Sequence, residues 1–257
     1  MRNTTFPSIL NKMSASEEYL IFSIGDSITE GAHATSDETT YTAVLTREIA
    51  AHFPDRSVLR YDGRSHETPD SEILPLETHG TPIRVQTGSK GKITVSRCGI
   101  GGNSTRRLLR RSTDFIGKEL EGRTGDLFLI VVGINDSIEK VPDKFADPTL
   151  YAKHLHTLID EIERVHPDAD VVLMTPTYYD YGTERESRLD PYVHEMKQVA
   201  NARNIPLVDL HQLWMDHLVI GADHYGQGDW LDTDRCHPTD AGHEAIGKEI
   251  ARHLLCQ

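Results

Sequence analysis

Residues 19–29 read YLIFSIGDSIT, and the interpretation of the whole chain starts from this stretch. Tyr19–Ile24 is a short apolar run, which is typical of a buried strand, and Gly25 ends it. Ser27 follows at once, so its hydroxyl is expected in a tight turn just beyond the strand. A serine hydroxyl becomes a useful nucleophile only when a base removes its proton. The stretch therefore predicts a strand and directs attention to a base elsewhere in the chain.

Apolar runs alternate with amphipathic segments along the rest of the chain. Strands are expected at 93–98, 127–132, 171–174 and 206–208, and helices at 40–52, from near 104, 148–165, 188–203 and 241–255. This alternation predicts an α/β fold with a mostly parallel sheet covered by helices on both faces. Functional groups of such folds gather at the carboxyl ends of the strands. Ser27, Gly102 and Asn135 each follow a predicted strand, so we expect them at one edge of the sheet.

The segment Asp234-Arg-Cys-His237-Pro offers the base. An imidazole acting as base needs one nitrogen facing the serine and an acceptor for its other N–H. An aspartate three residues earlier can supply that acceptor within one turn. On this motif alone, the alternative that Asp234 and His237 only tie down their loop stays open.

Two further positions can stabilise negative charge on a reacting oxygen. Gly102 lies in a glycine-rich turn, where the missing side chain permits close approach of its N–H. Asn135, in Gly-Ile-Asn-Asp after the strongest apolar run, has a side-chain amide that can donate to an oxyanion. A plain turn glycine and an Asx turn are the alternatives for these two features taken singly.

Taken together, these motifs resemble those of the SGNH (GDSL) hydrolase superfamily. The resemblance covers about residues 19–255, apart from 54–92, and rests on four blocks: Gly25-Asp26-Ser27, Gly102, Gly133-x-Asn135-Asp136 and Asp234-x-x-His237-Pro238. It implies a three-layer α/β/α sandwich with a mostly parallel, flavodoxin-like sheet.

The same resemblance implies a role for each matching residue. Ser27 would be the nucleophile, His237 the base, and Asp234 the group that orients the base. The N–H groups of Ser27 and Gly102 and the amide of Asn135 would form the oxyanion hole. Neither a metal nor an organic cofactor is implied. The expected reaction is hydrolysis of a carboxylic ester through an acyl-enzyme on Ser27.

The substrate is less well defined by the sequence. The segment 176–197 and Asp209-Leu-His211 resemble the branch that contains carbohydrate O-acetyl esterases, which favours acetyl or other short acyl esters of a carbohydrate or small polar alcohol. Aromatic residues suited to stacking on a sugar, or alternatively to packing, are Tyr178, Tyr179, Tyr181, Tyr225 and Trp230. The alternatives are a broad carboxylesterase, lysophospholipase or thioesterase, and an O-acyltransferase using the same residues.

The domain organisation follows from composition. Residues 1–18 are expected to form a frayed N-terminal arm, and residues 19–257 a single domain. Residues 54–92 are rich in Gly, Pro, Asp, Ser and Thr, and predict an irregular insertion that contains a hairpin. This insertion is longer than in compact members of the family, so it affects the expected shape of the pocket.

Charge and cysteine content exclude several classes of function. The formal net charge of −13 argues against a nucleic-acid partner and against docking on an anionic membrane. No segment is long and apolar enough to predict a membrane span, and no signal peptide is recognised, so we expect a cytoplasmic protein. Three cysteines without a C-x-x-C pair predict neither a disulfide framework nor a zinc site. The expected partner is a small-molecule ester; a homo-oligomer is a general prior for such enzymes.

Two other functional classes are weighed against this hypothesis. A non-catalytic carbohydrate-binding module has no need of a serine and a base. A metal hydrolase would rest on Asp223-His224 with Asp229 and Asp232, which lack helical ligand spacing. Cys98 and Cys236 each flank a site motif, and whether they approach each other is open.

Overall fold

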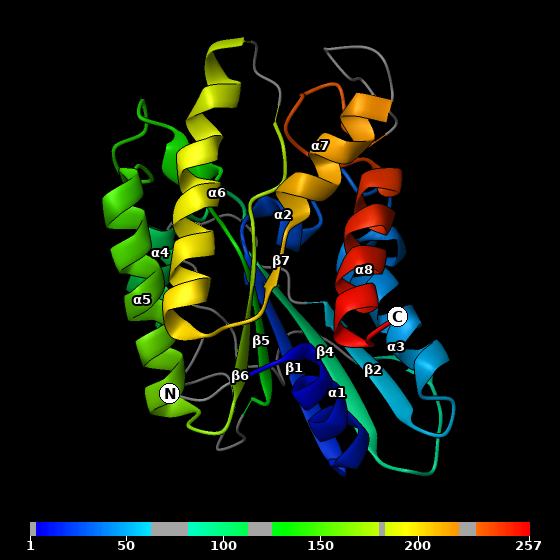
Figure 1. Ribbon diagram of the computed structural model, residues 1–257. Coiled ribbons are helices and arrows are strands. Elements are labelled where there is room, and N and C mark those ends of the chain that lie inside the picture. Colours follow the sequence, from blue (N-terminus) through cyan, green and yellow to red (C-terminus); the bar gives the residue numbers. More distant parts are fainter. Residues whose placement is uncertain (1–3, 63–81, 113–124, 180–182, 221–229) are drawn as a thin grey trace.

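The computed structural model describes residues 4–62, 82–112, 125–179, 183–220 and 230–257. These form one sheet with helices on both faces (Figure 1). The strands are β1 (Glu18–Gly25), β2 (Ser57–Asp62), β3 (Ile83–Gln86), β4 (Lys92–Gly99), β5 (Leu127–Val131), β6 (Asp170–Met174) and β7 (Leu207–Val208). Their order is β3-β2-β4-β1-β5-β6-β7, and all neighbouring pairs are parallel except β2 with β3. The predicted three-layer α/β/α class is therefore confirmed.

The helices divide between the two faces of the sheet. They are α1 (Phe6–Ala15), α2 (Ser27–Glu30), α3 (Tyr41–His52), α4 (Thr105–Ser112), α5 (Pro148–Val165), α6 (Thr183–Arg203), α7 (Leu210–Ile220) and α8 (Asp240–Leu254), with short 3-10 turns η1 (Asp37–Thr39) and η3 (Asn135–Ser137). Helices α1, α3, α7 and α8 pack in one apolar cluster, and α4, α5 and most of α6 in the other. No helix of the described part of the chain is long and apolar enough to cross a membrane.

Strand β1 separates these two cores and fixes the register of its neighbours. Tyr19 and Ile21 point into the cluster with α1, α3 and α8, whereas Phe22 and Ile24 point into the cluster with α5. This alternation follows from the two-residue period of a strand. Gly25, the last residue of β1, pairs with Gly99 of β4 and Val131 of β5. Three strands thus end at the same level of the sheet.

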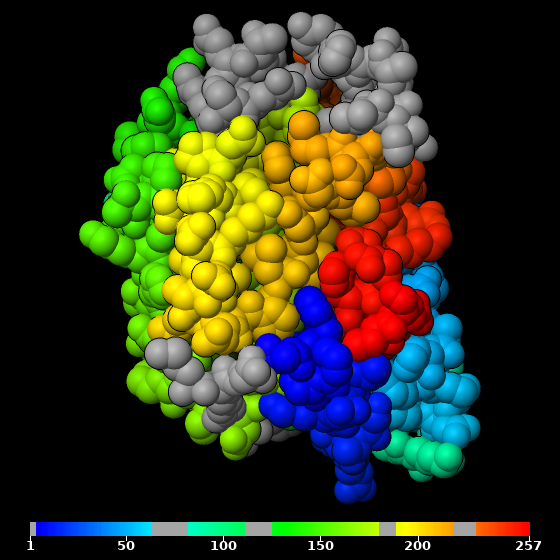
Figure 2. All heavy atoms as spheres, in the orientation of Figure 1, coloured from blue at the N-terminus to red at the C-terminus, as the bar shows by residue number. Residues whose placement is uncertain are grey.

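Residues 6–15 differ from the expected frayed arm because they form helix α1. Thr5 and Ser8 make a reciprocal capping box at its start, and Ile9 and Met13 are fully buried. The Arg56 guanidinium donates to the carbonyl of Met13 at 2.6 Å, which holds the end of the helix. Figure 2 shows this helix, in blue, against the red C-terminal helix α8. Polar residues between its members make this apolar stripe hard to recognise in the sequence. Its burial stabilises the helix.

The predicted insertion at 54–92 is more regular at its ends than expected. Its first part, β2, joins the sheet parallel to β4, and β3 pairs antiparallel to β2, in agreement with the predicted hairpin. The segment thus extends the sheet instead of lying outside it. Without these two strands, the order is that of a flavodoxin-like sheet. Residues 63–81 lie outside the described residues.

Candidate active site

Ser27 is the first residue of helix α2, directly beyond the end of β1. The Asp26 carboxylate caps this helix by accepting from the N–H of Ile28 at 3.0 Å. Gly25 makes the turn possible, because a Cβ there would lie 2.5 Å from the carbonyl oxygen of Val131 and 2.2 Å from Oγ1 of Thr29. The turn therefore presents Ser27 at the carboxyl edge of the sheet.

His237 and Asp234 come from the loop before α8 and complete a chain of hydrogen bonds with Ser27. Ser27 Oγ lies 2.8 Å from Nε2 of His237, and Nδ1 of His237 lies 2.5 Å from Oδ2 of Asp234. An ionised carboxylate can only accept, so Nδ1 carries the proton and Nε2 is left to accept from the serine hydroxyl. The structure thus brings together residues that are 210 positions apart in the sequence.

Hydrogen bonds within its own loop hold the Asp234 carboxylate in place. Its Oδ1 accepts from the N–H groups of Cys236 at 2.9 Å and His237 at 3.0 Å. Burial raises its pKa, but these bonds and the His237 side chain outweigh burial, so the pKa lies below its ordinary value. Arg235, in the left-handed region at φ 59°, lets the chain turn tightly between them. Asp234 therefore stays ionised in the neutral range.

Gly102 and Asn135 follow β4 and β5 and lie at the same edge of the sheet as Ser27. Gly102 has φ 72°, and a Cβ there would approach Nζ of Lys144 to 2.7 Å. Nζ of Lys144 also donates to Oδ1 of Asn135 at 3.3 Å. With its amide oxygen held by Lys144, Asn135 has its amide nitrogen left to donate. The positions of these residues suit donors to an oxyanion.

A buried carboxyl group connects the two loops that carry these residues. Asp136, fully buried, accepts from the backbone N–H of Thr105 at 3.0 Å and from its hydroxyl at 2.5 Å. Burial, opposed by these hydrogen bonds and reinforced by nearby Asp26, raises the pKa of Asp136 to about 7. Burial likewise raises the pKa of Asp26 to about 6. Two carboxyl groups with weakened acidity therefore lie behind the site.

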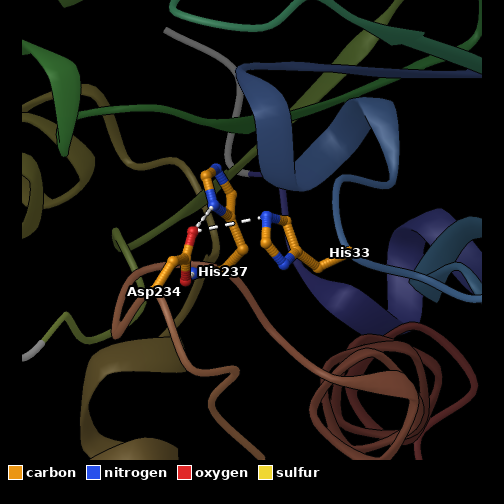
Figure 3. Close-up of side chains that lie close together, drawn as sticks. All are labelled: His33, Asp234 and His237. Atoms are coloured by element: carbon orange, nitrogen blue, oxygen red, sulfur yellow. Dashed lines mark hydrogen bonds and ion pairs between the residues drawn. The ribbon is translucent and has the colours of Figure 1, made fainter.

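A second imidazole, that of His33, lies against the ring of His237 (Figure 3). The two rings are stacked, with centroids 4.8 Å apart and an interplanar angle of 9°. Nδ1 of His33 is 2.5 Å from Oδ2 of Asp232, and its Nε2 is 3.4 Å from Oδ2 of Asp234. These contacts surround the His237–Asp234 pair with one more ring and one more carboxylate.

Among the described residues, His33, Asp234 and His237 place ligand atoms within 4.8 Å of one another, as a metal site requires. Nearly parallel rings direct their nitrogen lone pairs in parallel planes rather than toward one point. A tetrahedral zinc site needs converging lone pairs about 2.0–2.1 Å from the metal. The observed orientation therefore suits a hydrogen-bonded group better than a metal centre. The alternative metal residues Asp223, His224 and Asp229 lie outside the described residues.

The aromatic residues suggested for substrate stacking lie in different environments. Tyr178 and Tyr179 are buried in an apolar cluster, and the Tyr179 hydroxyl is 3.0 Å from Oγ of Ser137. Trp230 is partly exposed and stacks on His217, with centroids 3.7 Å apart. In this conformation Trp230 is the only one of the three that is more than slightly exposed. Tyr181 and Tyr225 lie outside the described residues.

The cysteines beside the site motifs, Cys98 and Cys236, are reduced and not joined in a disulfide. Cys236 is part of the apolar cluster with α8, whereas Cys98 packs against the cluster with α5. The sheet separates these clusters, so the two cysteines lie on opposite faces. Cys98 and Cys236 therefore do not lie side by side.

Sequence reasoning missed three residues that the structure places around the site. His33, Lys144 and Thr105 contact Asp234, Asn135 and Asp136, respectively. Of these residues, only Thr105 lies close to a recognised motif. Its hydroxyl was therefore the only one of these groups that the sequence could have indicated as part of the site. His33 and Lys144 stand in segments without a distinctive pattern.

The sheet, the turn after β1 and the residues gathered at its edge define a hydrolase of the SGNH type. More particularly, the chain belongs to the GDSL-like lipase/acylhydrolase family, whose sequence model matches residues 21–250. The protein is accordingly a carboxylic ester hydrolase. None of the curated protein sequences matches the chain.

Solved structures share the fold over nearly the whole chain. An acetylxylan esterase from Geobacillus stearothermophilus is 24% identical, with a TM-score of 0.64 over 95% of this chain and 96% of that one. A lipase/acylhydrolase from Enterococcus faecalis is 22% identical, with a TM-score of 0.60 over 92% and 95%. An alpha/beta hydrolase from the metagenome of Lake Arreo, Spain, is 23% identical, with a TM-score of 0.63 over 93% and 95%.

Proposed function

We propose that the protein hydrolyses esters by nucleophilic catalysis, with Ser27 as nucleophile, His237 as general base and Asp234 as the residue that orients the base. The observation that carries this proposal is the hydrogen-bonded chain from Ser27 Oγ through His237 to Asp234. A hydroxyl, an imidazole of defined tautomer and an ionised carboxylate in this order are the parts of an activated serine.

The reaction proceeds in two acyl-transfer steps. Ser27 Oγ attacks the ester carbonyl carbon while Nε2 of His237 takes its proton, and the carbonyl electron pair moves to oxygen. The N–H groups of Ser27 and Gly102 and the amide of Asn135 donate to this oxyanion. The carbon–oxygen ester bond then breaks, and the alcohol leaves with the proton from His237. Water attacks the acyl-enzyme by the same route and releases the acid and Ser27.

The proposed substrates are acetyl or other short acyl esters of a carbohydrate or small polar alcohol. The fold is shared with an enzyme named acetylxylan esterase over nearly the whole length of both chains, which supports this class. Trp230, partly exposed on the segment that leads to Asp234 and His237, is the aromatic residue that we propose to contact a sugar ring. A broader carboxylesterase, lysophospholipase or thioesterase activity is the second candidate.

The first experiment compares hydrolysis of p-nitrophenyl acetate, butyrate and octanoate by wild type and Ser27→Ala. We expect acetate to be preferred and the variant to lose roughly 10³-fold or more in kcat, because the nucleophile is absent. Ser14→Ala, on the exposed side of α1, is the matched control and should keep wild-type rates. Full activity of Ser27→Ala would refute the mechanism, and preference for octanoate would favour the second candidate.

Two measurements separate the remaining classes. In the presence of excess alcohol, a hydrolase releases mainly the free acid, whereas an O-acyltransferase using the same serine forms the new ester. Incubation with a chelator should leave the rate unchanged, since no step of the proposed mechanism uses a metal. Loss of activity that returns on adding a divalent cation would support a metal hydrolase.

A further inference from the structure

His33 has a backbone conformation that few residues other than glycine adopt. Its φ is 64°, in the left-handed region, in the loop after α2. The loop is fixed on both sides: Thr35 donates from its N–H at 2.8 Å and its hydroxyl at 2.5 Å to Asp240, and Nε2 of His243 is 3.1 Å from the carbonyl oxygen of Ala32. A strained conformation persists only where its surroundings determine it. These contacts turn the side chain of His33 toward the loop that carries the base.

Both nitrogens of His33 face carboxylates of that loop, and Figure 3 shows the contact with Asp234. Nδ1 is hydrogen-bonded to the carboxylate of Asp232. Nε2 faces the Asp234 oxygen that also accepts a hydrogen bond from His237. The hydrogen bond with His33 lowers the pKa of Asp232. The carboxylate that orients the base is thus contacted by two imidazoles from opposite ends of the chain.

The ring of His33 also limits the movement of His237. With the planes 9° apart and the centroids 4.8 Å apart, one face of the base is covered. A general base must keep Nε2 within hydrogen-bond reach of the serine hydroxyl, here 2.8 Å away. Rotation of His237 toward the side of His33 is blocked, so the stacked ring favours the reactive orientation.

We propose that His33 is a positioning residue for the catalytic pair: it holds the ring of His237 and the carboxylate of Asp234 through its stack and its anchor on Asp232. This inference rests on the proposed function, in which His237 is the base. His33 acts through His237 and Asp234, so its loss should affect turnover rather than binding of the ester.

The variant that tests this is His33→Asn. Asparagine accepts the left-handed conformation and keeps a short polar side chain, but it has no ring to stack. We expect kcat to fall about tenfold, because a loosened base reaches the reactive geometry less often, while KM stays within about twofold. His253→Asn is the matched control, because the ring of His253 packs at a tilt against Phe6 of α1. It should keep the wild-type kcat.

A second variant, Asp232→Asn, replaces the carboxylate that anchors the ring by a neutral amide and leaves the ring in place. Its amide oxygen can still accept from the N–H of Thr233, as Oδ1 of Asp232 does now. If His33 acts through this anchor, His33→Asn and Asp232→Asn each lower kcat, and the double variant is no slower than the slower single variant. Independent roles would instead multiply the two losses.

Proton NMR gives a readout that a purely structural role would not change. The low-field signal of the proton between His237 and Asp234 should shift or broaden in His33→Asn and stay unchanged in His253→Asn. A kcat within twofold of wild type, or a loss confined to KM, would overturn the inference. The proposed function is tested separately: if Ser27→Ala and His237→Ala are inactive while His33→Asn is normal, only the role of His33 fails.

Discussion

Lys144 shows how a residue outside the recognised motifs determines what a motif residue can do. An asparagine amide can present either end, and here the Lys144 ammonium group takes the oxygen of Asn135. The same Nζ would meet a Cβ placed on Gly102, so one cation lies beside two of the three predicted oxyanion donors. A fixed donor is worth more than a mobile one because no reorganisation is needed during the reaction.

At the residue scale, we predict that Lys144→Met lowers kcat about five- to tenfold by releasing the Asn135 amide and removing a positive charge. Asn135→Ala removes the donor itself and should cost about 10²–10³ in kcat. Lys153→Met, at an exposed position of α5, is the control for loss of a surface lysine. Steady-state kinetics on p-nitrophenyl acetate measure all three. Equal activity of Lys144→Met and wild type would show that Asn135 needs no support from Lys144.

At the scale of elements, the site is a consequence of how parallel strands end. Because β1, β4 and β5 run side by side in the same direction, the residues that follow them meet at one edge. His237, the proposed base, lies on a fourth segment, whose position is fixed by the start of α8. The Thr239 side chain caps that helix, and its N–H donates to the carbonyl of Trp230 at 3.0 Å.

Helix α1 gives the prediction at this scale. Met13→Ala should lower the free energy of unfolding by about 2–4 kcal/mol, because a fully buried side chain is removed from the core. Asn11→Ala, exposed on the same helix, should change it by less than about 0.5 kcal/mol. Urea unfolding followed by circular dichroism compares them. Similar stability of the two variants would mean that α1 contributes little to the fold.

At the scale of the whole molecule, one sheet joins two apolar cores, and a buried carboxyl group lies just beyond the end of β5. Asp136 is fully buried, and the physical cause of its raised pKa is that burial penalises the ionised form. The folded chain therefore binds this proton more tightly than the unfolded chain. The resulting stabilisation is fully present below the ordinary value of about 4 and is lost as the pH rises through about 7.

We therefore predict that Asp136→Asn gains stability relative to wild type as the pH rises from 5 to 8, by on the order of 2–4 kcal/mol. The amide keeps an acceptor for Thr105 and carries no charge. Asp143→Asn is the control, since Arg107 and Arg110 lower the pKa of Asp143, and its effect should be flat over this range. Urea unfolding at both pH values measures the difference. A pH-independent difference for Asp136→Asn would contradict the prediction.

The sequence by itself determined the parallel sheet, the family and the segments that meet at its edge. Apolar runs and helical periods are local patterns that indicate which residues are buried. They also indicate where strands end, and therefore that the residues after Gly25, Gly99 and Val131 lie at the edge of the sheet. Only the tertiary structure decided that α1 is docked, that β2 joins the sheet and that His33 lies against His237. The physical reason is that such contacts join residues far apart, 199 positions for His33 and Asp232, and depend on loop conformations that no local pattern encodes.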